Sequence, residues 1–403
     1  MTTSERAKRQ SEQRAFPDVV SVVMALQPSY PVYCLRPKLL ARTAERFTAL
    51  FPGTVMYAVK CNPHRYVLDA LYGAGIRHFD TASLPEIAQI AESYEDAACY
   101  FMHPVKARSV IQSAYRVYGV RSFAVDHMSE LEKVIEETGG GEGVEIVVRL
   151  ETPAVEGVMF HLASKFGASC GDAAEILRAA AARGLATGLS FHVGSQCRNP
   201  EAYRLALERV GEAIERSGVM PGCIDVGGGF PAAYPDVETP PLEAFMEKIR
   251  EGVAALSLDP AVRLLAEPGR ALVALGCSLL TQVQLRKGNQ LYINDGIYGS
   301  LSETEQGGIV PPVRLIRIGG EPSARFEGFT INGPTCDSLD VLRGRYLLPA
   351  DTREGDWIEL DRVGAYSNAM ATSFNGFHPE TFVEVHDEPP GEAPQAQTGT
   401  TAE

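Results

Sequence analysis

The stretch TVMYAVKCNP, residues 54–63, ends an apolar run on a lysine, and runs of the same kind recur along the chain. From residue 53 to residue 270, short apolar segments alternate with amphipathic ones. Near-continuous apolar runs are typical of strands that are buried on both faces. We expect eight such strands, at residues 54–60, 76–82, 98–104, 122–127, 144–151, 188–195, 223–230 and 263–270.

The amphipathic segments between these strands carry helix-boundary signals. Ser83 and Ser129 are each followed three residues later by a glutamate, which predicts N-terminal capping boxes. Segments 171–184 and 201–218 end on glycine, as helices often do. Eight strand–helix units predict an α/β fold with a closed, TIM-like (β/α)8 barrel, and an open doubly wound sheet is the alternative.

A second domain follows residue 270, where the chain changes to short β-rich segments separated by turns. This pattern predicts a mostly β domain, which the segment PVYCLR at 31–36 is expected to join. We therefore predict an N-terminal extension (1–30), the barrel (31–270), the β domain (271–385) and a disordered tail rich in proline, glycine and threonine (386–403).

Composition narrows the function classes. The 403 residues are 45% hydrophobic and 22% charged, as in ordinary two-domain globular proteins. A net charge of −14 without a Lys/Arg cluster argues against nucleic acid and favours a small cationic substrate. The eight cysteines show neither CxxC nor zinc spacing, the start of the chain is polar, and no run reaches about 18 apolar residues. We expect reduced thiols, a cytoplasmic location, and no metal site, signal peptide or membrane span.

Polar residues stand where the predicted strands end. In (β/α)8 barrels the catalytic groups lie at the carboxyl ends of the strands. Taken singly, a rim lysine could extend to water and a glycine run could be only a tight turn. Together they predict one site. The residues at these ends are Lys60, Asp80, Asp126, Arg149, His192, Gly227 to Gly229, Glu267 and Arg270.

This combination of residue types fits pyridoxal phosphate. A desolvated lysine such as Lys60 is a nucleophile toward an aldehyde. The glycine run, Ser195 and Arg270 offer donors for a phosphate, and His192 offers a ring for stacking. Glu267 can keep a pyridine nitrogen protonated, which makes the ring an electron sink for a carbanion at the substrate Cα.

Nine motifs then identify a resemblance that covers about residues 31–377 in order. The chain resembles the alanine-racemase-fold (fold type III) pyridoxal-phosphate-dependent decarboxylases, most closely the ornithine/lysine decarboxylases. The resemblance implies pyridoxal 5'-phosphate as cofactor and a homodimer with shared active sites. The motifs are YAVKCNP, FDTAS, SKFG, FHVGSQ, DVGGGFP, EPGR, NDGIYGS, GPTCDSLD and GAYSNAMATSFNGF.

The resemblance also implies roles for individual residues. Lys60 is implied to form the internal aldimine, with Asp80 and Glu86 tuning its charge, and Cys336 to protonate Cα. Cys336 and Asp337 are implied to reach the neighbouring subunit's site, and Lys165 to lie in the interface. The implied catalytic residues are Lys60, Cys336, His192 and Asp80; the cofactor-binding residues Lys60, Arg149, His192, Ser195, Gly228, Gly229, Glu267, Arg270 and Tyr366; and the substrate-binding residues Asp337 and Tyr298.

The implied activity is decarboxylation of a basic amino acid, L-ornithine to putrescine or L-lysine to cadaverine. Ornithine decarboxylases of the eukaryotic kind usually carry a second aspartate after NDGIYGS, which is absent here. Either Glu303 or Glu305 replaces it, or the pocket is shaped for a longer or modified substrate. Diaminopimelate decarboxylase is the alternative. An amino-acid racemase fits less well because Glu267, not arginine, would face the ring nitrogen. A vitamin-B6 carrier or an inactive regulatory paralogue fits less well because Lys60 and Cys336 are retained.

Overall fold

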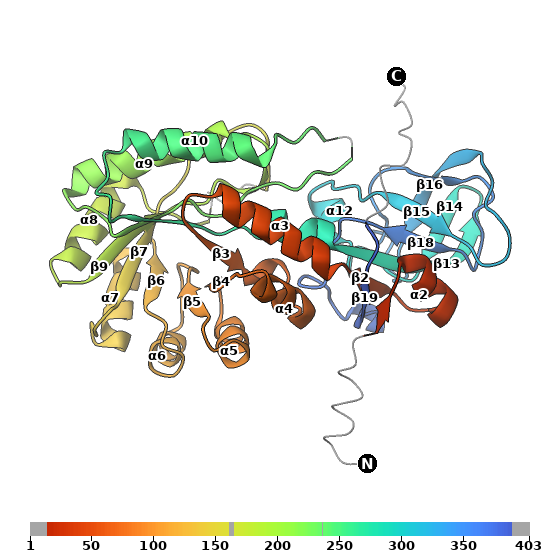
Figure 1. Cartoon of the computed structure of the whole chain (residues 1–403), viewed down its shortest axis with the longest axis horizontal. Helices are drawn as coiled ribbons and strands as arrows, with labels where there is room; N and C mark the ends of the chain where they lie inside the picture. Colours follow the sequence, from red (N-terminus) through yellow and green to blue (C-terminus); the bar gives the residue numbers. More distant parts are fainter. Residues whose placement is uncertain (1–13, 161–164, 236, 389–403) are drawn as a thin grey trace, which may run out of the picture.

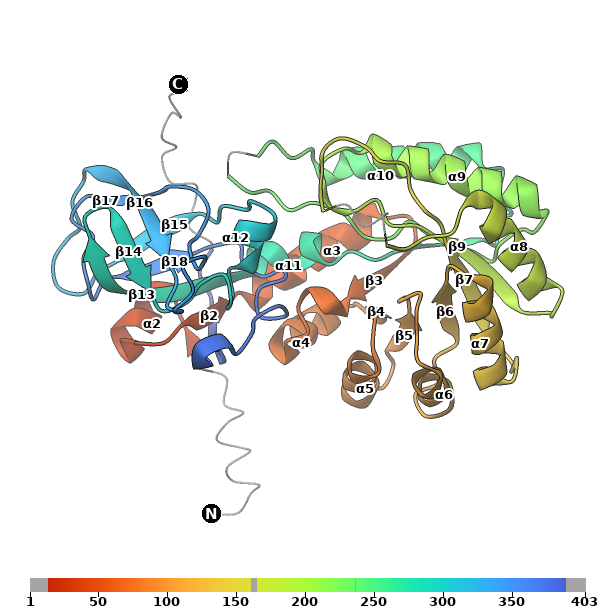
Figure 2. The same cartoon turned by 180° about the vertical axis from the view of Figure 1, so that it is seen from behind.

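The structure, a computed structural model, describes residues 14–160, 165–235 and 237–388. Figures 1 and 2 show the barrel and the β domain at opposite ends of the long axis. Residues 1–13 of the predicted extension and 389–403 of the predicted tail lie outside the described residues.

Eight parallel strands close into a barrel, as the alternation of segments predicts. Strand β12 pairs with β3, with Leu265 opposite Thr54, so the open-sheet alternative is wrong. Each strand overlaps a predicted one. In barrel order they are β3 (Thr54–Ala58), β4 (His78–Thr81), β5 (Ala98–Phe101), β6 (Ser122–Val125), β7 (Glu145–Arg149), β9 (Ala186–Ser190), β11 (Cys223–Asp225) and β12 (Arg263–Ala266).

Helices surround the barrel and bury their apolar faces against it, as Ile87 and Ile90 of α5 do. The last strand–helix unit is short: after β12 only α11 (Arg270–Val273) forms, because the chain leaves there for the β domain. The longer helices are α3 (Pro37–Leu50), α4 (Arg65–Gly73), α5 (Leu84–Ser93), α6 (Arg108–Arg116), α7 (Met128–Thr138), α8 (Cys170–Ala181), α9 (Glu201–Ser217) and α10 (Leu242–Ala255).

The predicted helix ends are partly correct. Ser83 caps α5 by accepting from the amide three residues on, and α9 ends on Gly218 in the left-handed conformation. The predicted cap at Ser129 is wrong, because the Nδ1 atom of His127 accepts from the Ser129 amide and α7 begins earlier. Helix α8 ends before Gly184, which lies in the following turn.

One nine-stranded sheet forms the framework of the second domain. Its order is β1-β19-β2-β13-β14-β16-β17, and β18 pairs with β13 and β15. Strand β2 lies between β13 and β19, and α2 (Val19–Leu26) packs on the same sheet. The strands are β1 (Ala15–Phe16), β2 (Val32–Leu35), β13 (Cys277–Lys287), β14 (Gln290–Ile293), β15 (Val313–Ile316), β16 (Phe326–Asn332), β17 (Tyr346–Pro349), β18 (Trp357–Leu360) and β19 (Thr381–Val385).

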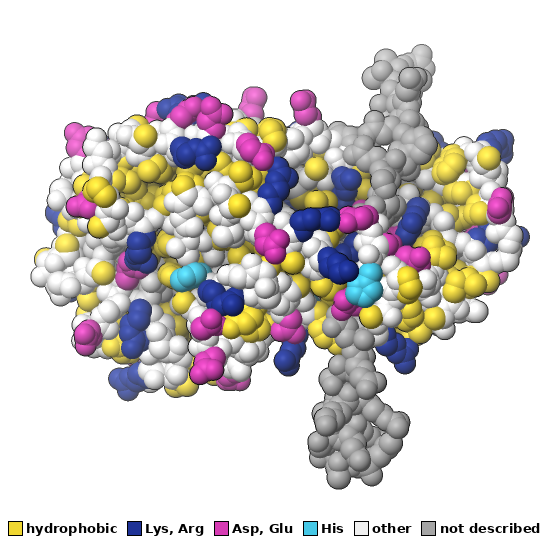
Figure 3. Space-filling view, viewed as in Figure 1, with side chains coloured by type: hydrophobic (Ala, Val, Ile, Leu, Met, Phe, Trp, Pro, Cys, Tyr) yellow, Lys and Arg dark blue, Asp and Glu magenta, His cyan; other side chains and the backbone are white. Residues whose placement is uncertain are grey.

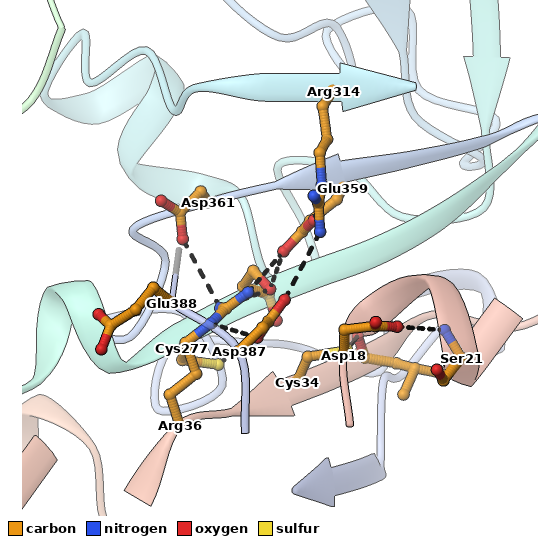
Figure 4. Close-up of polar contacts among 12 residues, drawn as sticks. Asp18, Ser21, Cys34, Arg36, Cys277, Arg314, Glu359, Asp361, Asp387 and Glu388 are labelled. Carbon is orange, nitrogen blue, oxygen red and sulfur yellow. Dashed lines mark hydrogen bonds and ion pairs between the residues drawn. The ribbon is translucent and has the colours of Figure 1, made fainter. Parts of the chain in front are cut away.

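A buried ion cluster surrounds Arg36, just after β2 (Figure 4). The Arg36 guanidinium is 1% exposed and donates to Glu359 and Asp387, each at 3.0 Å. Asp361 lies 3.8 Å from Arg36, and burial raises the pKa of Asp361 to about 6. The cluster therefore links an early strand, a late strand and the segment after β19, and it includes one carboxyl that is costly to ionise.

The surface carries charges of both signs. On the face seen in Figure 3, basic and acidic side chains are interspersed. No helix in the described parts of the chain has the length and apolar character needed to cross a membrane. All eight cysteines are unpaired.

Candidate active site

A cavity of about 390 Å³ opens at the carboxyl ends of the barrel strands. Lys60 follows β3, Asp80 lies on β4, Arg149 ends β7 and His192 follows β9, while Tyr366 comes from the β domain. All five residues line the cavity. The structure thus brings together side chains that the sequence placed at separate strand ends.

Lys60 lies in a single 3-10 turn, Val59–Cys61, directly after β3. The predicted strand ran to Lys60, but it ends at Ala58, because the chain turns there and the Asn62 amide donates to the Val59 carbonyl. The turn directs Lys60 into the cavity, where its Nζ donates to Asp80 Oδ2 at 2.7 Å. The side chain does not simply extend to water: a buried carboxylate receives it.

Charges around Lys60 determine its protonation. Burial alone lowers the pKa of the ammonium, but Asp80 and Glu267 outweigh burial and raise that pKa above its usual range. Glu86 lies close by, and its Oε2 accepts from the Ala82 amide at 2.7 Å. Burial raises the pKa of Glu86. Before it reacts, Lys60 is therefore held as an ammonium ion.

His192 is a neutral ring at neutral pH. Burial, Arg149 and Lys60 hold the pKa of His192 well below its usual range. Its Nδ1 accepts from the Gly194 amide at 3.0 Å, which fixes the orientation of the ring. A neutral imidazole with a fixed orientation is suited to contact a flat ligand without adding charge.

The predicted glycine run forms a tight turn packed against neighbouring backbone. Gly227 and Gly229 have φ of +68° and +100°, which side-chain-bearing residues rarely adopt. A Cβ on Gly228 would lie 3.0 Å from His192 Nε2, and one on Gly229 would lie 2.4 Å from the Gly194 carbonyl oxygen. The turn therefore requires glycine, and it lies against the His192 ring.

Arg270 and Ser195 lie close together near this turn. Ser195 begins β10 (Ser195–Cys197), which pairs with β8 (Val158–Phe160) in a two-stranded ribbon that was not predicted. The Arg270 residue is 3% exposed, and its Nη2 lies 3.4 Å from Ser195 Oγ. The buried Arg270 Nε has no hydrogen-bond partner among the described residues. A buried donor without a partner is costly, so this edge is suited to a phosphate.

Glu267 and Asp225 form a coupled carboxyl pair at the ends of β12 and β11. Burial raises the pKa of Glu267 well above its usual range, with further contributions from Asp225 and Asp80. Burial also raises the pKa of Asp225 to about 6. The negative charges of Asp225 and Asp80 make Glu267 harder to ionise, so Glu267 and Asp225 titrate as a coupled pair.

The remaining predicted residues lie elsewhere in the chain. Cys336 is exposed, and Tyr298 donates its hydroxyl to Asp337 Oδ2. Neither Cys336 nor Asp337 lines the cavity around Lys60. A second cavity, of about 600 Å³, is bordered by Tyr298, Glu305 and the residues just after Asp337. Within one chain, Tyr298 and Lys60 therefore line different cavities.

Three site residues were missed or assigned differently from the sequence. Asp225 was not predicted as a site residue. It lies in a predicted strand, two residues before the glycine run, and this position was the signal that could have identified it. Tyr234 was not among the predicted site residues. Its hydroxyl accepts a hydrogen bond from Arg270 Nη1 at 3.1 Å. Glu303, considered as a substrate contact, is paired with Arg270 instead. Such pairings across the fold leave no local pattern in the sequence.

Comparisons with known proteins agree with this geometry. A family model described as "Pyridoxal-dependent decarboxylase, pyridoxal binding domain" matches residues 38–274. The lysine/ornithine decarboxylase of Selenomonas ruminantium is 33% identical over 345 residues, covering 83% of this chain and 84% of that protein. The decarboxylase flvG of Aspergillus flavus is 30% identical over 358 residues, with 83% and 80% covered.

Solved structures are similar over nearly the whole chain. The Paramecium bursaria Chlorella virus arginine decarboxylase bound to agmatine gives a TM-score of 0.80 at 28% identity, covering 91% of this chain and 99% of that one. The lysine/ornithine decarboxylase of Vibrio vulnificus complexed with putrescine gives 0.78 at 29% identity, covering 96% and 99%.

Proposed function

The chain belongs to the pyridoxal-dependent decarboxylases, and we propose that it removes the α-carboxylate of a small basic amino acid, with L-ornithine and L-lysine as the leading candidates. One observation carries this proposal: the Lys60 amine points into a cavity at the barrel mouth, 2.7 Å from a buried carboxylate. Relatives described as lysine/ornithine decarboxylases support the choice of substrate.

The residues present fit pyridoxal 5'-phosphate. The free edge of Arg270, with Ser195 and the turn at Gly228 and Gly229, would hold the phosphate. His192 would lie against the ring. Glu267 would face the ring nitrogen, and Lys60 would hold the aldehyde carbon. Arg149 and Tyr366, which also line the cavity, complete the cofactor-binding set.

When bound, the cofactor supplies an electron sink for the charge that develops at the substrate Cα. Glu267, whose pKa is raised by burial, Asp225 and Asp80, would share a proton with the ring nitrogen. Asp80 holds the Lys60 ammonium in place. His192 adds no positive charge, because its pKa lies far below neutral.

An apolar wall supports loss of a carboxylate in particular. Met102, Pro104 and Phe166 line the cavity around Lys60. A carboxylate in contact with such a wall loses hydration, whereas neutral carbon dioxide does not need it. The wall therefore favours the products over the charged substrate group.

We also propose a homodimer with shared active sites, in which Cys336 and Asp337 complete the site of the partner. Neither residue lines the Lys60 cavity of its own chain, which supports this arrangement. Neighbouring segments expose apolar side chains, with Leu339 70% and Phe374 43% exposed, which is suited to an interface. Cys336 would protonate Cα, and Asp337, with Tyr298, would bind the distal ammonium of the substrate.

A substrate panel tests the activity. Ornithine, lysine, arginine and diaminopimelate should be compared for carbon dioxide release and amine product with cofactor present. We expect the highest kcat/KM with ornithine or lysine. Release from diaminopimelate alone would favour the alternative decarboxylase, and no release from any of the four would overturn the proposal. A cytoplasmic location, supported by eight unpaired cysteines, belongs to the same proposal.

A further inference from the structure

Glu303 contacts Arg270 from the β domain. It lies on α12 (Ser302–Gln306), and its carboxylate reaches Arg270 Nη1 at 2.6 Å and Nη2 at 2.5 Å. The side chains of Arg270 and Glu303 are 2% and 13% exposed. This is a bidentate, nearly buried ion pair between a short helix of one domain and the first turn after the barrel.

The pair with Glu303 uses two of the donors of Arg270. A guanidinium has five N–H groups, two on each Nη and one on Nε. At Nη1 one donates to Glu303 and the other to the Tyr234 hydroxyl at 3.1 Å. At Nη2 one donates to Glu303 and the other lies toward Ser195, at a long 3.4 Å. The Nε–H has no partner among the described residues.

The unused donors therefore share one edge. Nε and the second N–H of Nη2 point in the same direction from a planar guanidinium, away from the edge that Glu303 occupies. Ser195 marks that direction. Glu303 occupies the Nη1/Nη2 edge and leaves the Nε/Nη2 edge without a carboxylate, so a phosphate held by Arg270 would contact it from the side of Ser195.

We propose that Glu303 is a positioning residue for the cofactor phosphate. It holds the Arg270 guanidinium in the one orientation that presents its free edge beside Ser195, and it balances a charge that is otherwise costly to bury. The proposal rests on the assignment of Arg270 to the phosphate under the proposed function. It assigns Glu303 to the cofactor site rather than to substrate recognition.

The test compares two aldehydes that differ only in the phosphate. Dissociation constants of pyridoxal phosphate and of pyridoxal are measured by visible absorbance on protein stripped of cofactor. Glu303→Gln removes the charge and places an amide N–H₂ against Arg270. Glu305→Gln is the matched control, because Glu305 lies on the same helix and is exposed. Thermal unfolding of each stripped protein checks that it is folded.

We expect Glu303→Gln to weaken pyridoxal phosphate binding about tenfold or more, with pyridoxal binding changed less than about twofold. Glu305→Gln should leave both constants unchanged. Glu303→Asp, which keeps the charge but shortens its reach, should give a smaller loss in the same direction and serves if the glutamine variant does not fold.

Three results would overturn the proposal. Equal or tighter binding of pyridoxal phosphate by Glu303→Gln would make Glu303 a bystander or a competitor of the phosphate. Equal loss of both aldehydes would indicate a general structural role. If the unaltered protein binds both aldehydes equally, Arg270 does not hold the phosphate, and the proposed cofactor site fails together with this inference.

Discussion

Lys60 Nζ lies 2.7 Å from Asp80 Oδ2, and the Asp80 side chain is only 1% exposed. The negative charge of Asp80 helps to raise the pKa of Lys60 against the effect of burial. Asp80→Asn should therefore lower the pKa of Lys60, so that attachment of the cofactor, followed by visible absorbance, begins at lower pH. Asp96→Asn, which alters an exposed ion pair with Arg77, is the control. An unchanged midpoint in Asp80→Asn would contradict the coupling.

Lys60→Ala should abolish the visible absorbance of the lysine-bound cofactor, because the Lys60 amine is the one held at the strand ends by a buried carboxylate. Lys165→Ala is a matched control, since Lys165 lines the same cavity but has no carboxylate partner there in the described residues. We expect the Lys165 variant to keep its absorbance. A visible spectrum unchanged in Lys60→Ala would refute the assigned lysine.

Glu267→Gln should keep cofactor binding and lose turnover. Glutamine has nearly the same shape, but it cannot exchange a proton with the ring nitrogen, so the electron sink is weakened. We expect kcat to fall by at least about tenfold, since a hydrogen bond to a charged group is worth about 1.5–3 kcal/mol. Steady-state kinetics at saturating cofactor measure the effect. Full activity would show that the Glu267 proton is not used.

Hybrid dimers test whether sites are shared between chains. Lys60→Ala and Cys336→Ala proteins should each be nearly inactive alone. Random mixing should restore up to about a quarter of full activity, because half of the dimers are hybrids and each hybrid has one intact site. Native mass spectrometry confirms that hybrids form. Hybrids without activity would argue against shared sites.

The buried carboxyl of Asp361 should make stability depend on pH. Burial raises its pKa to about 6 from 3.8, so the folded state favours the protonated form, and the resulting stability is lost as pH rises through about 6. Asp361→Asn removes this dependence. Relative to the unaltered protein, the variant should gain about 1–3 kcal/mol between pH 4 and pH 7.5, measured by denaturant unfolding.

Asp351→Asn gives the opposite sign and is the control for that experiment. Its hydrogen bond with Arg317 lowers the pKa of Asp351, so its ionised form stabilises the fold above its usual pKa. This contribution develops as pH rises toward the usual pKa of 3.8 and is complete above it. The asparagine variant should therefore be less stable than the unaltered protein by a nearly constant amount from about pH 5 to pH 7.5, and the difference should shrink only in more acidic solution. The test of Asp361 fails if its variant follows Asp351 in direction.

The barrel could be predicted from the sequence because its signal is local and repeated. Each strand is a short apolar run, and each helix has its own apolar face, so eight repetitions leave few alternatives. Closure of the barrel has no local signal in the sequence, because it depends on the pairing of Leu265 with Thr54, which joins the last strand to the first. His127 escaped prediction as a cap because histidine is not among the residues that usually cap helices.

Site residues could be predicted only where a residue type suited to catalysis or binding stands at the end of a predicted strand. Lys60, Asp80 and His192 stand at such ends, and the structure brings them to one cavity. Glu303 was judged by its position after a motif, whereas its partner is decided by how α12 packs against Arg270. Contacts between domains depend on the assembled fold, and residue type alone does not encode them.

Strand β2 lies between β13 and β19, and those partners are encoded far from it along the chain. During synthesis on the ribosome, β2 emerges early, and the entire barrel follows before β13 is made. The edge of β2 that β19 covers stays unpaired until the last strand emerges, and an open edge invites association with other chains. The barrel can form while the chain is growing, but the second domain is completed only near the end of translation.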